Sequence, residues 1–329
     1  MATTKSPTIS WSEIRTWTTC RKRHHWSYRR NIQARGVQRA PWLGTCGHVA
    51  IAAILNGFPW EPAVDEWHDI QLRTQKLWDE EIEEIGELVA TVKQIIPRYL
   101  AQYPFDFRSV ATERRFRVSL RGIRTRLDGY IDAIVEDKQN RLWLMDHKFP
   151  KQFRPREDLD LDGQLGIYHY ACHKAGFPVV GIIYNQLLAK APKRPELTKK
   201  GTMSRVDITS DWATYREALV YEGLDPADYL DMREKLADKK FFDRYFIYRP
   251  MSEINIFVED VRQRVMDARR ANSPIYMSPN AINCGMCDFR ELCLAEVKGA
   301  DVEHLIQLNY IPRGRRTEAA PREEEEYDV

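Results

Sequence analysis

The sequence predicts an α/β fold, and three patterns along the chain predict it. Apolar residues recur at helical spacing through residues 42–56 and 61–102. They alternate with polar residues through 110–120 and 124–135, which is the period of a β-strand. A helical stretch at 163–176 is then followed by one more apolar strand. Helices, a β-meander, a further helix and a further strand, in that order, are typical of an α/β core.

The composition is that of an ordinary globular protein. Its 329 residues are 43% hydrophobic and 30% charged, and 50 basic against 48 acidic side chains leave a net charge of +2. No apolar run is long enough to span a bilayer, and the N-terminus lacks a hydrophobic signal core. We therefore expect a cytoplasmic protein with no membrane partner, whose six cysteines stay reduced.

The first predicted helix carries a concentrated positive charge. Residues 10–30 predict a helix. Ser10 can cap its start, and Ile14, Trp17 and Cys20 recur on one face. Beyond Cys20 the same segment places Arg, Lys and His side chains among Trp and Tyr. Such a mixture suits a phosphate backbone with occasional base stacking, but a solvated helix face is an equal alternative.

The central part of the chain predicts a group of neighbouring strands. Residues 110–120, 124–135 and 142–146 read as three strands, with a polar turn at 137–141 between the last two. A strand at 179–188 leads to a basic, proline-containing loop, and residues 211–270 return to helix and mixed structure. The basic loop suits nucleic acid, although many such loops only keep a surface soluble.

Two carboxylates and a lysine gather on the predicted hairpin. Asp132 lies near the end of one strand, and Asp146 and Lys148 end the next. Because alternate residues of a strand share a face, Asp146 and Lys148 point the same way, and we expect Asp132 beside them. Mg²⁺ or Mn²⁺ would suit these oxygens, and a lysine beside the ion can orient or deprotonate a water. Read alone, the pattern is equally a turn at a strand end.

Further residues strengthen the metal interpretation only as a set. His48 follows a small-residue segment on a predicted helix, where a lone histidine is more often a core residue than a ligand. Gln164 and Tyr168 lie four residues apart on another helix and therefore share one face. Such a pair means little by itself, but beside the acids it would contact DNA or hold the lysine.

The order of these motifs resembles the PD-(D/E)XK nuclease superfamily. The resemblance is to its RecB-like and AddB-like branch, which includes the iron–sulfur exonucleases of CRISPR adaptation and phage relatives. It spans residues 8 to 293, and six weak motifs in the right order make it specific. They are S-x-S-x-I…C (Ser10, Ser12, Ile14, Cys20), G-x-x-G-H (ending at His48), G-x-x-D (Gly129–Asp132), D-x-K (Asp146–Lys148), Q-x-x-x-Y (Gln164–Tyr168) and C-x2-C-x5-C (Cys284, Cys287, Cys293).

The resemblance implies a restriction-endonuclease-like core, in which a mixed sheet is flanked by helices, and a set of site residues. His48, Asp132 and Asp146 would bind Mg²⁺ or Mn²⁺, and Lys148 would be the catalytic lysine. Gln164 and Tyr168 would support the catalytic site and the DNA. Two other acids stand apart from the predicted set, since Asp128 fits the motif worse and Glu113 is only an additional acid.

The resemblance also implies an activity and a setting. The expected enzyme is a metal-dependent deoxyribonuclease, and more narrowly an exonuclease, acting on single-stranded DNA or on duplexes with ends. We expect a bacterial or phage-infected cytoplasm, and a protein partner in a recombination or CRISPR-related complex. We expect one domain at 1–312, with its catalytic core at 105–190, and a charged, disordered tail at 313–329.

Four cysteines at opposite ends of the chain predict a second metal centre. Cys20 stands alone near the N-terminus, and Cys284, Cys287 and Cys293 form a tight group near the C-terminus. Zinc usually takes two pairs of cysteines, so this division into one and three favours a [4Fe–4S] cluster, which the resemblance also implies. A zinc site with four cysteine ligands and a set of unrelated thiols remain alternatives. In either metal form the site would join the N- and C-terminal segments, with a structural role.

Other functions remain open from the sequence. A catalytically inactive DNA- or partner-binding protein of the same fold would have lost one of the metal or lysine positions, and all of them are present. An electron-transfer protein would need an exposed, redox-active cluster. Cys46 and Cys172 have no ligand partners at suitable spacing, and we expect both to be buried.

Overall fold

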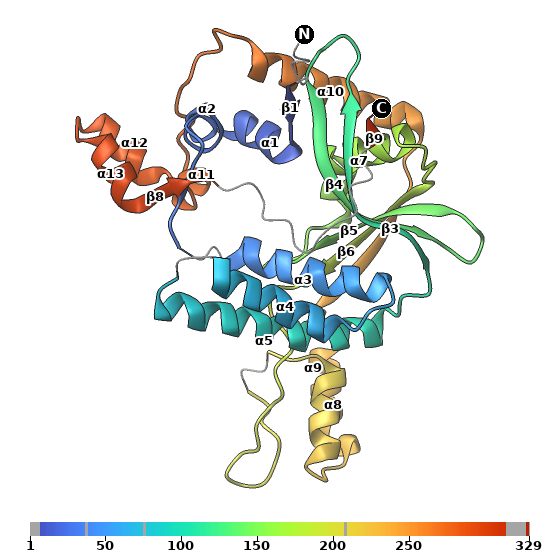
Figure 1. Cartoon of the computed structure of the whole chain (residues 1–329). Coiled ribbons are helices and arrows are strands. Elements are labelled where there is room, and N and C mark those ends of the chain that lie inside the picture. The colour runs from blue at the N-terminus through green and yellow to red at the C-terminus, as the bar shows by residue number, and fades with distance from the viewer. Residues whose placement is uncertain (1–6, 37–38, 75–76, 207–208, 314–326, 329) are drawn as a thin grey trace.

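The computed structural model describes residues 7–36, 39–74, 77–206, 209–313 and 327–328 (Figure 1). At its centre is one mixed sheet with the strand order β7-β6-β5-β4-β3-β9, and β1 pairs with β4. The strands are β1 (Thr8–Ile9), β3 (Arg108–Ser119), β4 (Arg126–Glu136), β5 (Leu142–Lys148), β6 (Gly181–Leu187), β7 (Phe242–Ile247) and β9 (Tyr327–Asp328). The prediction of an α/β fold with a mixed sheet is confirmed.

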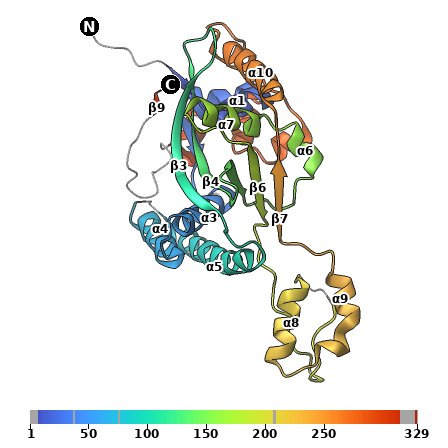
Figure 2. The same cartoon turned by 90° about the vertical axis from the view of Figure 1, so that its right-hand side faces the viewer.

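Helices cover both faces of this sheet (Figure 2). On one face lie α3 (Arg39–Leu55), α4 (Trp60–Thr74) and α5 (Asp79–Gln102). On the other lie α1 (Trp11–Thr19), α7 (Gly163–Lys174) and α10 (Met251–Arg269). Side chains alternate between the faces, as strand geometry requires. Ile134 and Leu144 join the core beneath α1, α7 and α10, whereas Ala133 and Met145 face the opposite way.

The β4–β5 hairpin opens at the two aspartates of the predicted site. Antiparallel pairing runs from Glu136↔Leu142 to Ala133↔Met145 and stops there. Beyond that point β4 continues along β3, while β5 continues beside β6 in parallel as far as Lys148↔Gln186. The strands therefore separate at Asp132 and Asp146, which leaves both side chains beside a gap in the ladder.

The predicted helix over residues 10–30 is three shorter pieces. Ser10 caps α1 as expected, since its hydroxyl accepts from the Glu13 N–H at 3.2 Å. The helix stops at Cys20, which has extended backbone angles, and α2 (Arg21–His24) and a π-helical turn (His25–Arg29) follow. Threonine hydroxyls near the end of α1 bond back to its carbonyls, which competes with a regular helix. Cys20 therefore lies at a corner.

The terminal segments lie against each other on one side of the sheet. After the π-helical turn, β2 (Ile32–Ala34) pairs antiparallel with β8 (Tyr310–Pro312). Between α10 and β8 lie α11 (Ala281–Gly285), α12 (Arg290–Val297) and α13 (Val302–Asn309). Of the tail predicted at 313–329, residues 314–326 and 329 lie outside the described residues.

A small helical lobe projects from the sheet between β6 and β7 (Figures 1 and 2). It contains α8 (Trp212–Tyr221), a 3-10 turn (Pro226–Tyr229) and α9 (Leu230–Leu236), and it has its own small core. The remaining helix, α6 (Arg156–Asp160), follows β5. Among the described residues, no helix is both long enough and apolar enough to cross a membrane.

Candidate functional site

Where β4 and β5 separate, the Asp132 side chain bonds to the backbone of β5. Its Oδ2 accepts a hydrogen bond from the His147 backbone N–H at 2.8 Å, taking the place of a ladder partner. The other oxygen, Oδ1, lies 3.5 Å from His48 Nδ1. Asp132 thus holds the opened strand on one side and faces α3 on the other.

His48 reaches the sheet because α3 can approach β5 very closely at Gly47. A Cβ atom at Gly47 would collide with the Phe149 ring, so any larger residue would force the helix and the strand end apart. One turn earlier, a Cβ atom at Gly44 would meet nothing within 4 Å. The absence of a side chain at Gly47 therefore lets α3 come close enough to bring His48 to the acids.

A third ligand-type residue, Glu113, joins His48 and Asp132. Their potential ligand atoms all lie within 4.8 Å of one another, and His48 Nδ1 is 3.5 Å from Glu113 Oε1. Glu113 comes from β3, where the register shifts between Ser109 and Ala111, and it has a positive φ of 48°. The sequence interpretation left Glu113 out. This irregular backbone interrupts simple alternation, and the run of charged residues after Thr112 was its only signal in the sequence.

Asp146 lies beside this group rather than within it. It is almost fully buried, and its Oδ1 and Oδ2 lie 2.8 and 2.7 Å from Lys148 Nζ. The Oδ2 atom meets no hydrogen-bond geometry among the described residues, although the ammonium is near. Burial raises the pKa of Asp146 to about 6, with Asp132 adding to the rise and Lys148 opposing it.

Neighbouring carboxylates favour the protonated forms of His48 and Lys148. Burial acts to lower the pKa of His48, but Asp132 and Glu113 outweigh it and raise that pKa above its ordinary value. Burial likewise opposes the charge of Lys148, while Asp146 and Asp132 raise its pKa. His147 is different, because burial and the neighbouring cations hold its pKa well below normal.

Gln164 and Tyr168 project from α7 toward the same acids. Asp162 caps α7 by accepting from the Gln164 and Leu165 backbone N–H groups. Burial raises the pKa of Tyr168 to about 12, and the charges of Asp146 and Lys148 also act on this hydroxyl. All six predicted site residues therefore lie in one region, and the structure adds Glu113 to them.

The residues present fit a hard divalent cation. Two carboxylates and one imidazole converge, and a buried carboxylate oxygen beside them lacks a good hydrogen bond. Carboxylate oxygens suit Mg²⁺ and Mn²⁺, and the imidazole makes Mn²⁺ the better match. Asp128, the alternative carboxylate considered from the sequence, forms an ion pair with Arg115, which donates to its two oxygens at 2.9 and 2.8 Å.

The four predicted cluster cysteines lie where the chain ends meet, in an arrangement we name the terminal clasp (residues 20–34 with 276–313). Its small core combines Trp26 and Ile32 with Phe289, Leu292 and Tyr310. Ion pairs neutralise basic side chains that the sequence left available for nucleic acid. Arg21–Asp267 joins the first segment of the clasp to α10, and Lys22–Glu296 and Arg30–Glu303 join its two segments. These contacts hold the clasp through protein atoms alone.

The cysteine sulfurs themselves are near one another without forming a tight site. Burial raises the pKa of the Cys287 and Cys293 thiols, and a charge at Cys20 adds to the rise in both. Within the described ranges, the four sulfurs are not a group that lies wholly within 4.8 Å. A tetrahedral zinc site with bonds of about 2.3 Å needs sulfurs about 3.8 Å apart. Cys46 and Cys172 are fully buried, as expected.

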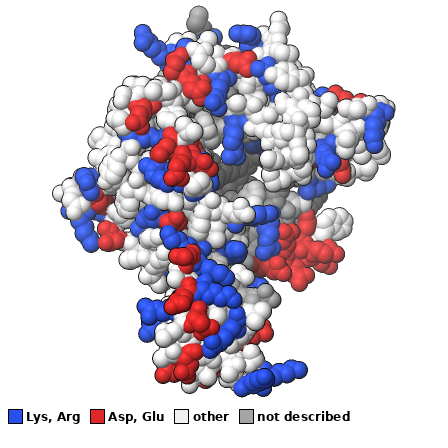
Figure 3. All heavy atoms as spheres, turned by 180° about the vertical axis from the view of Figure 1, so that it is seen from behind, with Lys and Arg blue, Asp and Glu red and all other residues white. Residues whose placement is uncertain are grey.

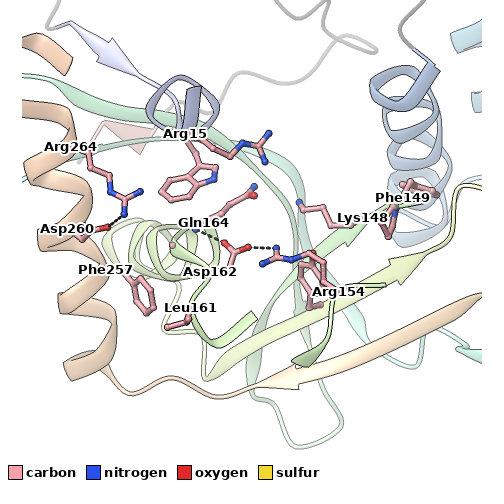
Figure 4. A pocket seen from close by; sticks show the side chains of 14 residues that line it. Arg15, Lys148, Phe149, Arg154, Leu161, Asp162, Gln164, Phe257, Asp260 and Arg264 are labelled. Carbon is pink, nitrogen blue, oxygen red and sulfur yellow. Dashed lines mark hydrogen bonds and ion pairs between the residues drawn. The ribbon is translucent and has the colours of Figure 1, made fainter. Parts of the chain in front are cut away.

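A pocket of about 600 Å³ adjoins the candidate metal site. Lys148 and Gln164 line it, together with residues of α1, α10 and the segment after β5. In Figure 4, Arg15, Lys148 and Arg154 enter this space from three different elements. Figure 3 shows that one face of the molecule is hollowed near its middle, with Lys and Arg side chains beside the hollow. Four basic side chains line the pocket, Arg15, Lys148, Arg154 and Arg264, against two acidic ones, Asp162 and Asp260.

One of three comparisons with known proteins identifies a family. A family model of the PD-(D/E)XK nuclease superfamily matches residues 8–294. A solved structure described as "Crystal structure of SSO0001" is 12% identical and has a TM-score of 0.35, with 88% of this chain and 86% of that chain covered. The search of curated proteins found no significant match.

Proposed function

The chain belongs to the PD-(D/E)XK nuclease superfamily, and on that basis we propose that it is a Mn²⁺- or Mg²⁺-dependent DNA exonuclease. Members of the superfamily are typically metal-dependent nucleases that act on nucleic acid. The observation that carries the proposal is the convergence of His48, Glu113 and Asp132 beside the Asp146–Lys148 pair. A buried group of this kind has no evident structural purpose, because it places like charges together at a gap in the sheet.

The metal ligands in this proposal are His48, Asp132 and Glu113, with Asp146 as the fourth. A divalent ion held there would polarise the scissile phosphate and lower the pKa of a water. Asp146 would hold the Lys148 ammonium, which lies within 3 Å of both carboxylate oxygens, toward the phosphate. Lys148 would offset the charge of the phosphate and help to position the attacking water.

Tyr168 and Gln164 would be positioning residues. The Tyr168 ring packs edge-on against Phe116 at 5.4 Å, which fixes its hydroxyl near Lys148 and Asp146. Gln164 lines the pocket between Tyr168 and solvent. We expect both to orient the lysine and the DNA strand.

We further propose that Cys20, Cys284, Cys287 and Cys293 hold a [4Fe–4S] cluster within the terminal clasp. The support is their sequence spacing and their position where the terminal segments meet, where Cys20 and Cys287 lie close enough to act on the Cys293 thiol. The role would be structural, because the cluster would add a link between segments that also meet at Trp26, Ile32 and Leu292. The proposed setting is the cytoplasm of a bacterium or of a phage-infected host, within recombination, repair or CRISPR-related DNA processing.

The activity can be tested on protein purified without oxygen. End-labelled single- and double-stranded DNA should be shortened from an end with Mn²⁺, whereas circular single-stranded DNA should stay intact. Lys148→Ala and Asp132→Asn should lower cleavage by at least about 10²-fold, since each removes a charge at the reacting phosphate. Lys138→Ala is the matched control, because Lys138 is an exposed lysine of the same hairpin that pairs only with Asp106 among the described residues.

The possible results separate the alternatives. Full activity of Lys148→Ala would refute the site assignment, and rapid cutting of circles would make the enzyme an endonuclease. Binding without cleavage by the wild type would favour the inactive DNA-binding protein. Iron and acid-labile sulfide should be found in the wild type and lost in Cys287→Ala, whereas stoichiometric zinc would replace the cluster proposal.

A further inference from the structure

The pocket beside Lys148 combines the two features that a nucleotide requires. Aromatic side chains from three elements line it, namely Trp11 of α1, Tyr184 of β6 and Phe257 of α10. Its volume of about 600 Å³ lies within the range of small-ligand sites, and it is far too small for a duplex. Bases stack on aromatic faces in proteins that bind single strands.

The pocket carries a net positive charge, and both of its acidic side chains form ion pairs with arginines. Asp162 pairs with Arg154 and also caps α7, and Asp260 pairs with Arg264 at 2.7 Å. Within the part of the chain that the structure describes, the Arg15 guanidinium forms no hydrogen bond or ion pair, and Figure 4 shows it directed into the pocket. Arg15 is therefore available to a phosphate.

Arg154 is fixed between the pocket and the catalytic strands. The buried Gln186 side chain accepts from the Arg154 backbone N–H at 2.8 Å and donates to its carbonyl at 3.0 Å. Gln186 is also the register partner of Lys148. These hydrogen bonds fix the backbone of Arg154 relative to the strand that carries Lys148. A single strand of DNA that passes Lys148 would therefore also pass Arg154.

Trp11 is placed by close packing on the start of α7. A Cβ atom at Gly163 would lie 2.6 Å from the outer edge of the Trp11 indole, so the glycine allows that edge to touch the start of the helix. The indole is part of the pocket wall and is only partly buried. It thus contributes aromatic surface to the cavity.

We propose that this pocket binds the unpaired nucleotide next to the scissile phosphate, with its base on Trp11 and its phosphate between Arg15 and Arg154. The inference rests on the nuclease function proposed above and narrows its substrate to single-stranded DNA or frayed ends. A base can reach an aromatic wall only after it has left the duplex stack. The pocket would therefore select against intact duplex at this position.

A scan with abasic oligonucleotides tests the proposal by binding alone. Fluorescence anisotropy in the presence of a chelator would measure the affinity of the full-length protein, purified without oxygen, for labelled single strands with one abasic site at successive positions. One position should lose affinity by about 5- to 150-fold in the wild type, as expected for one stacked base. Trp11→Ala should lose similar affinity for the intact strand and should no longer distinguish the abasic one.

Matched variants guard against simple misfolding. Trp11→Phe should keep most of the discrimination, and Trp78→Ala, at an exposed tryptophan of the α5 end, should keep all of it. Arg15→Gln should lower the slope of log affinity against log salt by about 0.7, whereas Arg216→Gln on the exposed face of α8 should leave the slope largely unchanged. A flat abasic scan in the wild type would overturn the nucleotide pocket. A positive scan without cleavage would uphold it and refute the nuclease proposal instead.

Discussion

Replacing Glu113 by Gln should change the stability of the metal-free protein in opposite directions at low and high pH. Glu113 Oε1 lies 3.5 Å from His48 Nδ1, and its carboxylate lies within 4.8 Å of Asp132. At an effective dielectric constant of about 20, a charged His48 attracts Glu113 by about 5 kcal/mol. The ionised Asp132 repels Glu113 by about 3 kcal/mol or more.

The sign of the effect depends on the protonation of His48. The pKa of His48 is raised in the folded protein, so its stabilising charge is present at low pH and is lost as the pH rises through that pKa. Below that pKa, the attraction exceeds the repulsion, and Glu113→Gln should be less stable by at most about 2 kcal/mol. Above it only the repulsion remains, and the variant should be more stable by about 3 kcal/mol.

Urea unfolding in chelator at about pH 5.5 and about pH 9 would measure both free energies. Glu136→Gln is a suitable control, because Glu136 is an acid at the end of β4 that pairs with Arg108 away from the group. In parallel, calorimetric titration with Mn²⁺ should show weaker binding by Glu113→Gln. The same sign of stability change at both pH values, with unchanged Mn²⁺ affinity, would refute the reasoning.

Other outcomes follow from packing and burial. Gly47→Ala should weaken Mn²⁺ binding in calorimetry by displacing α3, whereas Gly44→Ala should not; equal affinities would contradict the close approach. Leu292→Ala should cost about 2–5 kcal/mol in unfolding free energy, and amide exchange should rise first in β2 and β8. Burial lowers the pKa of His169 to about 4, so its contribution should be lost as the pH falls from 6.5 to 4, by at most about 3 kcal/mol. His169→Gln should flatten that part of the stability curve, and an unchanged curve would argue against it.

The local sequence pattern predicts the site residues that lie on regular strands. Asp146 and Lys148 share a face because β5 is straight, and their strand was recognisable from its apolar run. His48 could be placed beside them only through the resemblance, since no local pattern reveals that Gly47 lets α3 touch Phe149. The sheet itself followed from periodicity, which is why its central strands were found.

What the sequence did not reveal depends on irregular backbone and on contacts between distant segments. Glu113 was missed because a register shift and a positive φ on β3 decide where its side chain points. The strand β7 was missed because its residues 242–247 mix charged and aromatic side chains without alternation. The pocket combines Arg15 with Arg264, and no local pattern relates residues so far apart.

The pairing of β2 with β8 has a consequence for how the chain matures during translation. Arg313 donates a hydrogen bond to the Tyr28 hydroxyl, 285 residues earlier in the chain. The segment from Cys20 to Ala34 therefore leaves the ribosome long before its partners exist, while α3 and the β3–β5 strands can already assemble. Any product that ends before α12 would carry the acids of the candidate site yet lack the closed clasp. Synthesis of β8 would thus be the step that allows the clasp to close.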